Sequence, residues 1–179
     1  MNGDNEVHSQ RRMGLVMQAL AWLTLMALFG LGFSDLLEQQ GNPNQSVETR
    51  YTAEGLREVT LKRNRYGHYV TSGRINGEPV VFMLDTGATG VALPESIARR
   101  LGLQPGRRIS TQTANGTGTA YAVELDEVSV GDIALADVPA SILPGLATGE
   151  VLLGMSFLRH IEFTQRGDTL VLRQHGGMR

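Results

Sequence analysis

The sequence contains no cysteine, and this absence excludes several kinds of fold and site. The protein cannot depend on disulfides, on a thiol nucleophile or on a cysteine-based zinc site. Its four histidines are scattered without the spacing of metal ligands, at His8, His68, His160 and His175. We therefore expect no metal site, and no motif in the sequence indicates an organic cofactor.

An excess of charge of one sign is also missing. The chain of 179 residues has 16 Lys and Arg against 18 Asp and Glu, a net charge of -2, and its isoelectric point is near 6.1. Because nucleic-acid-binding domains usually carry a basic face, we expect no nucleic-acid partner. The 41% of hydrophobic residues is typical of a folded protein, and the length allows one domain plus additional segments.

Long apolar runs are absent except for one near the N-terminus. No charged residue occurs from Met13 to Phe33, and a helix of about 20 apolar residues spans the hydrocarbon core of a bilayer. A cleaved signal peptide is an alternative, but its apolar region is about 7–15 residues long, and Gly30-Leu31-Gly32 is a poor cleavage site. A buried core helix would show a polar face. We therefore favour an uncleaved single-pass transmembrane anchor over residues 13–33.

The charges beside this run predict its orientation. Arg11 and Arg12 precede it, whereas Asp35 and Glu38 are the first charged residues after it. By the positive-inside rule, residues 1–12 stay in the cytoplasm and the rest of the chain crosses the membrane. In a Gram-negative bacterium this means an inner-membrane protein with a periplasmic C-terminal domain.

Residues 34–57 are predicted to be a linker, and residues 58–179 a folded domain. The segment 39–52 is polar, contains Gly, Pro and Asn, and has no apolar period, which is typical of solvated chain. After it, short alternating or apolar runs are separated by turn residues such as Asn76-Gly77, a hairpin signal. Strands are predicted at 59–61, 68–75, 80–84, 108–113, 121–130, 133–138, 161–164 and 169–172, and short helices at 94–101 and 151–159. This pattern predicts an all-β, barrel-like domain.

The triplet Asp85-Thr86-Gly87 is the most informative motif. It follows the apolar segment 79–84, which is typical of a buried strand, and the small residues 88–90 come after it. A carboxylate at the end of a buried strand is costly unless it is hydrogen-bonded or paired. The alternative is a plain turn at the end of a strand, because Asp and Gly are common turn residues.

Three elements in order resemble the retropepsin-like aspartic proteases, and in particular a bacterial branch with an N-terminal membrane anchor and a periplasmic protease domain. They are the strand and loop 81–89, the segment Leu152-Leu153-Gly154, and the Gly-containing stretch 114–118 at the position of the family's flap. The resemblance covers roughly residues 69–172 and implies a closed β-barrel. It implies that Asp85 is the catalytic carboxylate and that Thr86, Gly87, Ala88 and Thr89 support the catalytic loop. Leu153 and Gly154 would pack against this loop. The flap, which binds substrate, would contain Asn115, Gly116, Thr117 and Gly118.

The sequence departs from the retroviral pattern in two places. Retroviral enzymes commonly have an acidic residue at the position of Thr89 and an arginine at that of Met155, which form an ion pair. Both positions are neutral here, so neither leaves a buried charge without its partner. The run of glycines flanked by isoleucines in the retroviral flap is also missing, and Asn115-Gly116 is equally compatible with an ordinary hairpin turn.

Peptide hydrolysis by this family needs two carboxyl groups that share a water molecule, one protonated and one ionised. This chain has one Asp-Thr-Gly triplet, and the part after the linker is too short for a two-lobed enzyme. The second Asp85 must then come from another copy, which predicts a homodimer with the active site on its two-fold axis. The protein is thus interpreted as an aspartic endopeptidase, a hydrolase acting on peptide or protein substrates. The alternative is a membrane-tethered peptide-binding module with the same fold and little or no turnover.

Overall fold

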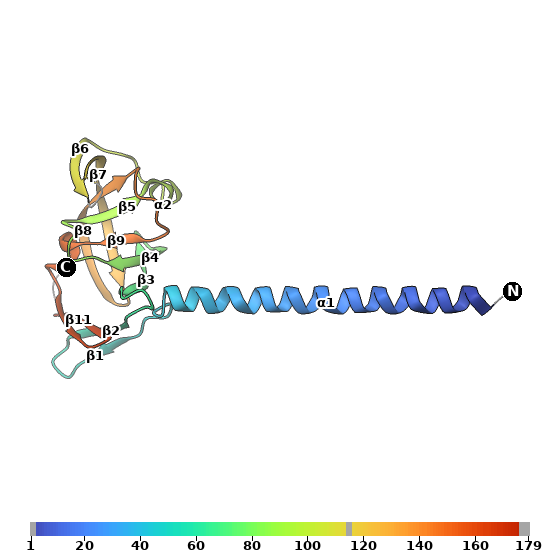
Figure 1. Ribbon diagram of the computed structural model, residues 1–179. Helices are drawn as coiled ribbons and strands as arrows, with labels where there is room; N and C mark the ends of the chain where they lie inside the picture. The colour runs from blue at the N-terminus through green and yellow to red at the C-terminus, as the bar shows by residue number, and fades with distance from the viewer. Residues whose placement is uncertain (1–2, 114–115, 176–179) are drawn as a thin grey trace. The chain divides into compact units, whose positions relative to one another are not determined.

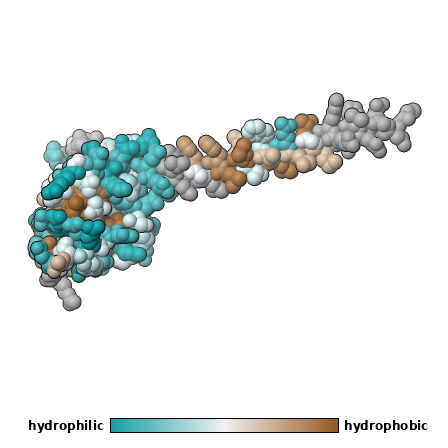
Figure 2. Space-filling model, turned by 90° about the horizontal axis from the view of Figure 1, so that it is seen from below, coloured by the Kyte–Doolittle hydropathy of each residue, from teal (hydrophilic) through white to brown (hydrophobic). Residues whose placement is uncertain are grey.

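The computed structural model describes residues 3–113 and 116–175, which form two units, Met1–Gln39 and Gln40–Arg179 (Figure 1). Helix α1 (Gly3–Gly41) accounts for most of the first unit, and its last two residues, Gln40 and Gly41, belong to the second. Within α1, Met13–Gly30 has a mean hydropathy of 1.7 and no buried residue. Figure 2 shows apolar side chains along the visible face of this helix. Its length and composition fit a membrane span, and a signal sequence would have the same properties.

The second unit consists of two β-sheets and two short helices. The larger sheet has the strand order β3-β4-β9-β5-β8-β7-β6, and the smaller one has the order β1-β2-β11-β10. Figure 1 shows β6 and β7 at the end of this unit that is remote from β1, β2 and β11. The bounds of the elements are β1 Thr49–Tyr51, β2 Arg57–Lys62, β3 Val70–Ile75, β4 Glu78–Leu84, β5 Val91–Pro94, α2 Glu95–Arg100, β6 Arg108–Thr113, β7 Gly116–Val130, β8 Ile133–Leu143, β9 Val151–Leu153, α3 Met155–Leu158, β10 Glu162–Arg166 and β11 Thr169–Gln174.

The larger sheet bends round until β3 meets β7, so the unit is the mostly β, barrel-like domain that the sequence predicts. Only two residue pairs, Arg74↔Ser129 and Ile75↔Val128, join these strands, and the expected closed barrel is therefore only partly closed. Gly73 permits the contact: a Cβ atom there would stand 2.4 Å from the carbonyl oxygen of Ser129 and 2.6 Å from the ring of Phe82. A larger residue would push β7 away from β3.

The core lies between the two sheets, and the alternation of the strands explains its composition. In β2, Val59 and Leu61 are fully buried while Thr60 is exposed, as a strand with one face on a core requires. β5 is different because all four of its residues are buried, so it shows no alternation. The largest fully buried side chains are those of Phe82 and Phe157, from β4 and α3.

The predicted hairpins and the first helix are confirmed, but the second helix is only partly right. Asn76 and Gly77 have φ values of 50° and 82°, as a tight hairpin turn needs. Helix α2 ends at Arg100, and Gly102 follows with a φ of 69°. The sequence predicted one helix over 151–159, whereas Val151–Leu153 is strand β9 and only Met155–Leu158 is helical. Mostly buried strands of three or four residues, such as β9 and β5, are too short for their periodicity to be distinguished from that of a helix.

Part of the predicted linker, residues 34–57, lies in the compact second unit, which begins at Gln40. Asn44 is buried, and its side-chain oxygen accepts a hydrogen bond from the Lys62 N–H at 2.7 Å. Its side-chain nitrogen donates to the carbonyl oxygens of Lys62 at 2.8 Å and Val70 at 2.7 Å. Further on, the Tyr51 hydroxyl donates to Asp132 at 2.7 Å, and this hydrogen bond raises the pKa of Tyr51. Polar side chains of this segment thus form hydrogen bonds with the strands of the domain.

Candidate active site

Strand β4 delivers Asp85 to the site. This strand runs parallel to β9, with Met83 beside Leu152 and Leu84 beside Leu153. The backbone N–H of Asp85 continues the pairing by donating to the carbonyl oxygen of Leu153 at 3.2 Å. β4 and β9 are far apart in the sequence but adjacent in space. The segment Leu152-Leu153-Gly154 therefore helps to position the loop that contains Asp85. Leu153 is fully buried in this role.

The loop after β4 fixes the direction of the Asp85 carboxylate. The Gly87 N–H donates to Asp85 Oδ1 at 2.9 Å, and the Ala88 N–H donates to the Asp85 carbonyl oxygen at 3.2 Å. A Cβ atom at Gly87 would lie 3.2 Å from the same carboxylate oxygen, so glycine leaves room for the hydrogen bond. Asp85 is half-buried, whereas Thr86, Gly87 and Thr89 are exposed. The carboxylate is therefore held by backbone groups at an open surface.

Gly154 packs against the far side of the same loop. A Cβ atom at this position would stand 2.2 Å from the carbonyl oxygen of Gly90 and 2.7 Å from that of Ala88. The next residue, Met155, donates its N–H to the Ala88 carbonyl oxygen at 2.9 Å. The loop and the β9–α3 connection can approach this closely only because residue 154 has no side chain.

Ser156 is a supporting residue of the loop that the sequence analysis missed. Its buried hydroxyl accepts a hydrogen bond from the Val91 N–H at 2.9 Å, immediately after the loop ends. Val91 is fully buried at the start of β5, where a backbone N–H needs a hydrogen-bond acceptor within the protein. The available signal was a small polar residue two positions after Gly154, inside an otherwise apolar run.

Thr86 borders an apolar pocket of about 210 Å³ beside the loop. Thr86 is exposed, and its hydroxyl makes no hydrogen bond to the described residues, whereas the Gly87 N–H and the Ala88 N–H both donate to Asp85. The pocket is lined by Tyr69, Leu84, Thr86, Leu158, Phe163, Gln165 and Leu170. The sequence analysis did not predict this surface, because its residues come from separate strands and from α3.

The candidate flap is a hairpin of β6 and β7. Gly116, Thr117 and Gly118 begin β7 and pair with the end of β6, with Thr117 opposite Gln112. Asn115, which was also assigned to the flap, lies outside the described residues. A hairpin is thus present where the resemblance placed one, and its role over a substrate remains a prediction.

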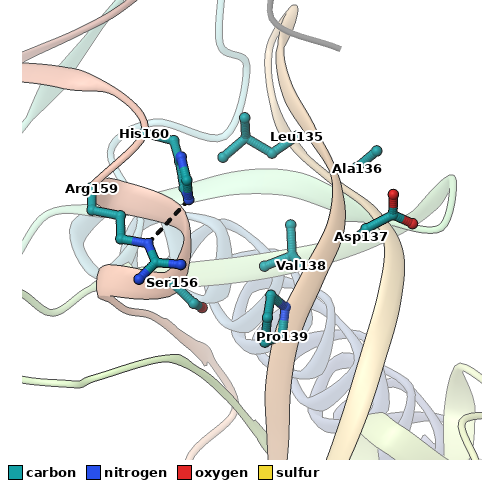
Figure 3. Close-up of a pocket in the computed structure, with 8 residues that line it drawn as sticks. All are labelled: Leu135, Ala136, Asp137, Val138, Pro139, Ser156, Arg159 and His160. Atoms are coloured by element: carbon teal, nitrogen blue, oxygen red, sulfur yellow. Dashed lines mark hydrogen bonds between the residues drawn. The ribbon is translucent and has the colours of Figure 1, made fainter.

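A second pocket, of about 340 Å³, is lined by Ser156 and lies between α3 and β8 (Figure 3). There the Arg159 Nε–H donates to His160 Nε2 at 3.1 Å. Figure 3 shows the Asp137 carboxylate pointing away from these two side chains. Asp85 does not line this pocket, and in the described ranges 3–113 and 116–175 no group of three or more His, Asp or Glu side chains could hold a metal ion.

Residues 71–160, about half of the chain, match the family described as gag-polyprotein putative aspartyl protease. The chain belongs to this family. It is 36% identical over 125 residues to an uncharacterized protein in the cobV 5′ region of a Sinorhizobium species, and this alignment covers 68% of this chain and 54% of that protein. It is 31% identical over 120 residues to an uncharacterized protein of Rickettsia prowazekii, which covers 64% and 51%. The chain spans about half the length of these relatives.

The structure of this aspartyl protease family member is similar to that of a retropepsin-like aspartic protease from Rickettsia conorii. The two superpose with a TM-score of 0.60 at 28% identity, over 72% of this chain and 96% of that one. The fold is therefore retropepsin-like, as the three sequence elements implied. The matched region contains both Asp85 and Gly154, so the family match covers the loop and its packing partner.

Proposed function

We propose that this protein is a membrane-anchored aspartic endopeptidase in which two copies each contribute one Asp85. The observation that carries the proposal is the position of Asp85 at the end of β4, in a loop packed by Gly154 and bonded to β9. The Gly87 N–H binds the carboxylate, and backbone hydrogen bonds to Leu153 and Met155 hold the loop in place. Catalysis by a general base requires such positioning before the substrate arrives.

In the proposed dimer, the two Asp85 carboxyls share one proton. Like charges about 3 Å apart cannot both ionise, so one carboxyl is a base and the other an acid. The ionised carboxyl accepts a proton from a water molecule, and that water attacks the carbonyl carbon of the peptide. The protonated carboxyl donates a hydrogen bond to the carbonyl oxygen. The two apparent pKa values belong to the pair and not to either copy.

The remaining loop residues are assigned roles that fit their exposure. Thr86 is exposed, and we assign its hydroxyl a hydrogen bond to the loop of the second copy, which would hold the two carboxyls in register. Gly87 supplies an N–H to the carboxylate. Ala88 links the loop to α3 through its carbonyl oxygen, and Thr89 is the exposed neutral residue that follows it.

The anchor and the flap complete the proposal. Met13–Gly30 would hold the protein in the bacterial inner membrane as a single-pass anchor, with Arg11 and Arg12 on the cytoplasmic side and the protease domain in the periplasm.

A peptide substrate would bind in extended form beneath the hairpin that contains Gly116, Thr117 and Gly118. Because β6 is at the edge of the larger sheet, its backbone groups are suited to pair with such a peptide.

Substitution of Asp85 tests the proposed function. We expect the full chain in detergent micelles to cleave unfolded protein or peptide at mildly acidic pH. The Asp85→Asn variant keeps the shape of the side chain but cannot supply a base, so kcat/KM falls by at least about a hundredfold. The measurement is the release of peptide termini from a peptide library, identified by mass spectrometry.

Asp126→Asn is the matched control, because Asp126 is an exposed carboxylate on β7 that lies outside the loop. Its activity should equal that of the parent. Cleavage by Asp85→Asn at the parental rate contradicts the assignment of this site. If the folded parent binds library peptides and cleaves none of them, the protein is a peptide-binding module with this fold.

A further inference from the structure

The connection between β2 and β3 concentrates positive charge. Residues 59–77 contain four of the 16 Lys and Arg of the chain and no Asp or Glu. Three of these bases, Lys62, Arg63 and Arg65, lie in residues 62–68, which we call the basic loop, and all three are exposed. The proposed catalysis gives this loop no role, so its charge needs another explanation.

Asn64 gives the basic loop an ordered shape. Its side-chain oxygen accepts hydrogen bonds from the N–H groups of Tyr66 at 3.0 Å and His68 at 2.9 Å. Its backbone N–H donates to the His68 carbonyl oxygen at 2.8 Å, and Gly67 turns the chain with a φ of 88°. Asparagine is common in turns because its side chain bonds nearby backbone groups in this way. The exposed bases are therefore presented by a backbone that is already ordered.

The basic loop is also joined to the end of α1. The Asn64 side-chain nitrogen donates to the Gly41 carbonyl oxygen at 2.9 Å, and the Arg65 guanidinium donates to the side-chain oxygen of Gln40. Gln40 and Gly41 are the last residues of α1 and belong to the same unit as the loop. These hydrogen bonds place the loop beside the residues through which the chain leaves the proposed anchor.

The length of helix after the apolar run limits how far the basic loop can be from the lipid. The uncharged run ends at Phe33, and residues 34–41 continue α1 with a rise of about 12 Å. The headgroup layer on each side of the hydrocarbon core is about 5–8 Å thick. With Phe33 at the edge of the core, Gly41 is therefore within roughly 8 Å of the headgroups. This is about one Debye length at physiological salt, so bases there are attracted by an anionic surface.

Tyr66 adds a side chain that suits a membrane interface. It is 65% exposed, and the central carbon of the Arg65 guanidinium lies 4.8 Å from the centre of its ring. Tyrosine is enriched at the level of the headgroups because its ring is apolar and its hydroxyl is polar. A guanidinium forms short, charge-assisted hydrogen bonds with phosphate oxygens. The two side chains thus match the two kinds of chemistry that a phospholipid surface offers.

We propose that the basic loop binds the phosphate groups of anionic phospholipids. The inference rests on the proposed single-pass anchor and goes beyond it, because it gives the protease domain its own contact with the bilayer. Arg63 shares its charge with Asp168, so Lys62 and Arg65 supply most of the attraction, and Tyr66 lies among the headgroups. The contact restricts rotation of the domain about the end of α1 and keeps one face toward the membrane.

A fluorescent label in the loop tests this contact. The sequence has no cysteine, so His68→Cys places one thiol at an exposed position of the basic loop for an environment-sensitive dye. The full chain is inserted into lipid nanodiscs of phosphatidylcholine alone or with phosphatidylglycerol, both containing spin-labelled headgroups. We expect strong quenching and emission at shorter wavelength only in the anionic nanodiscs. The control is Ser110→Cys on β6, at the end of the domain remote from β2 (Figure 1), and its dye should stay in water in both lipids.

Loss of charge gives an independent readout. Each Lys or Arg near an anionic surface strengthens binding about fivefold. In the His68→Cys background, K62Q/R65Q should therefore lower the ratio of docked to undocked domain at least about tenfold. R107Q/R108Q removes the same charge from exposed positions at the start of β6 and should leave the quenching unchanged. Equal quenching in neutral and anionic nanodiscs, or parental quenching of K62Q/R65Q, overturns the proposal.

The outcome is separable from that of the proposed function. Protein that does not elute with nanodiscs lacks the anchor, which removes this contact and the membrane part of the proposed function together. If the protein elutes with them and the dye at His68→Cys stays unquenched in both lipids, the anchor stands and the contact is wrong. If the dye docks and Asp85→Asn cleaves as the parent does, the contact stands and the proposed chemistry is wrong.

Discussion

At the scale of single residues, glycines position the site by allowing backbone segments to approach closely. Gly154 contacts the carbonyl oxygens of Gly90 and Ala88 at distances that no side chain could occupy. Gly73 has the same role where β3 meets β7, next to the ring of Phe82. The position of the Asp85 loop therefore depends on glycine at residue 154, because a side chain there would overlap the backbone of the loop.

We expect Gly154→Ala to destabilise the domain and to abolish cleavage. The added methyl group would overlap the backbone of the loop, and overpacking of this kind costs about 3 kcal/mol. Thermal unfolding followed by circular dichroism should show a Tm lower by about 10 °C. Gly145→Ala is the control, because a Cβ atom there meets nothing within 4 Å. An unchanged Tm for Gly154→Ala would show that the loop can move aside.

At the scale of elements, the segment after α1 belongs to the folded domain. Asn44 connects it to Lys62 at the end of β2 and to Val70 at the start of β3 through three side-chain hydrogen bonds. The Asn44 carbonyl oxygen also accepts from the Ser72 N–H at 3.0 Å. A polar side chain that satisfies backbone groups of two strands stabilises the sheet corner as a turn would.

Removal of the Asn44 side chain should weaken the domain. Asn44→Ala leaves backbone groups of Lys62 and Val70 without these partners, at a cost of about 2–3 kcal/mol. Gln45→Ala, at the exposed neighbouring position, should unfold like the parent. For the same reason a fragment of residues 45–179 should unfold at lower denaturant concentration than one of residues 40–179. Equal midpoints for the two fragments would contradict this role of Asn44.

At the scale of the whole molecule, the proposed enzyme needs two copies, and the anchor affects how often they meet. Attachment to one membrane confines the copies to a surface and raises their effective concentration. The chain has a single Asp-Thr-Gly triplet, so a free protomer would hold half of the proposed site.

We expect removal of residues 1–39 to make cleavage strongly dependent on protein concentration. The specific activity of the 40–179 fragment should rise on concentration as dimers form. The full chain in lipid vesicles should keep its specific activity over the same range of bulk dilution, because its surface density is unchanged. A fragment with constant specific activity that sediments as a monomer throughout would contradict the homodimer.

Much of the fold could be predicted from the sequence because its signals are local. The apolar segment before Asp85, the Asn76-Gly77 turn and the short helix ended by Gly102 depend on neighbours in the chain. The resemblance suggested Gly154 as a packing residue, and the structure shows this glycine close to the backbone of Gly90 and Ala88. Strand β9 and the support of Val91 by Ser156 were missed, because short buried strands and single hydroxyls carry no periodic signal.

The sequence by itself determined the apolar helix, the all-β domain and the one carboxylate of the proposed site, since each depends on residues that are adjacent in the chain. Only the tertiary structure decided that β9 lies beside β4, that Asn44 joins the domain, and that β10 remains as an edge beside Thr86. The physical reason is the same in all three cases. Long-range strand pairing is set by the packing of distant segments and by chain closure, and neither leaves a pattern in the local sequence.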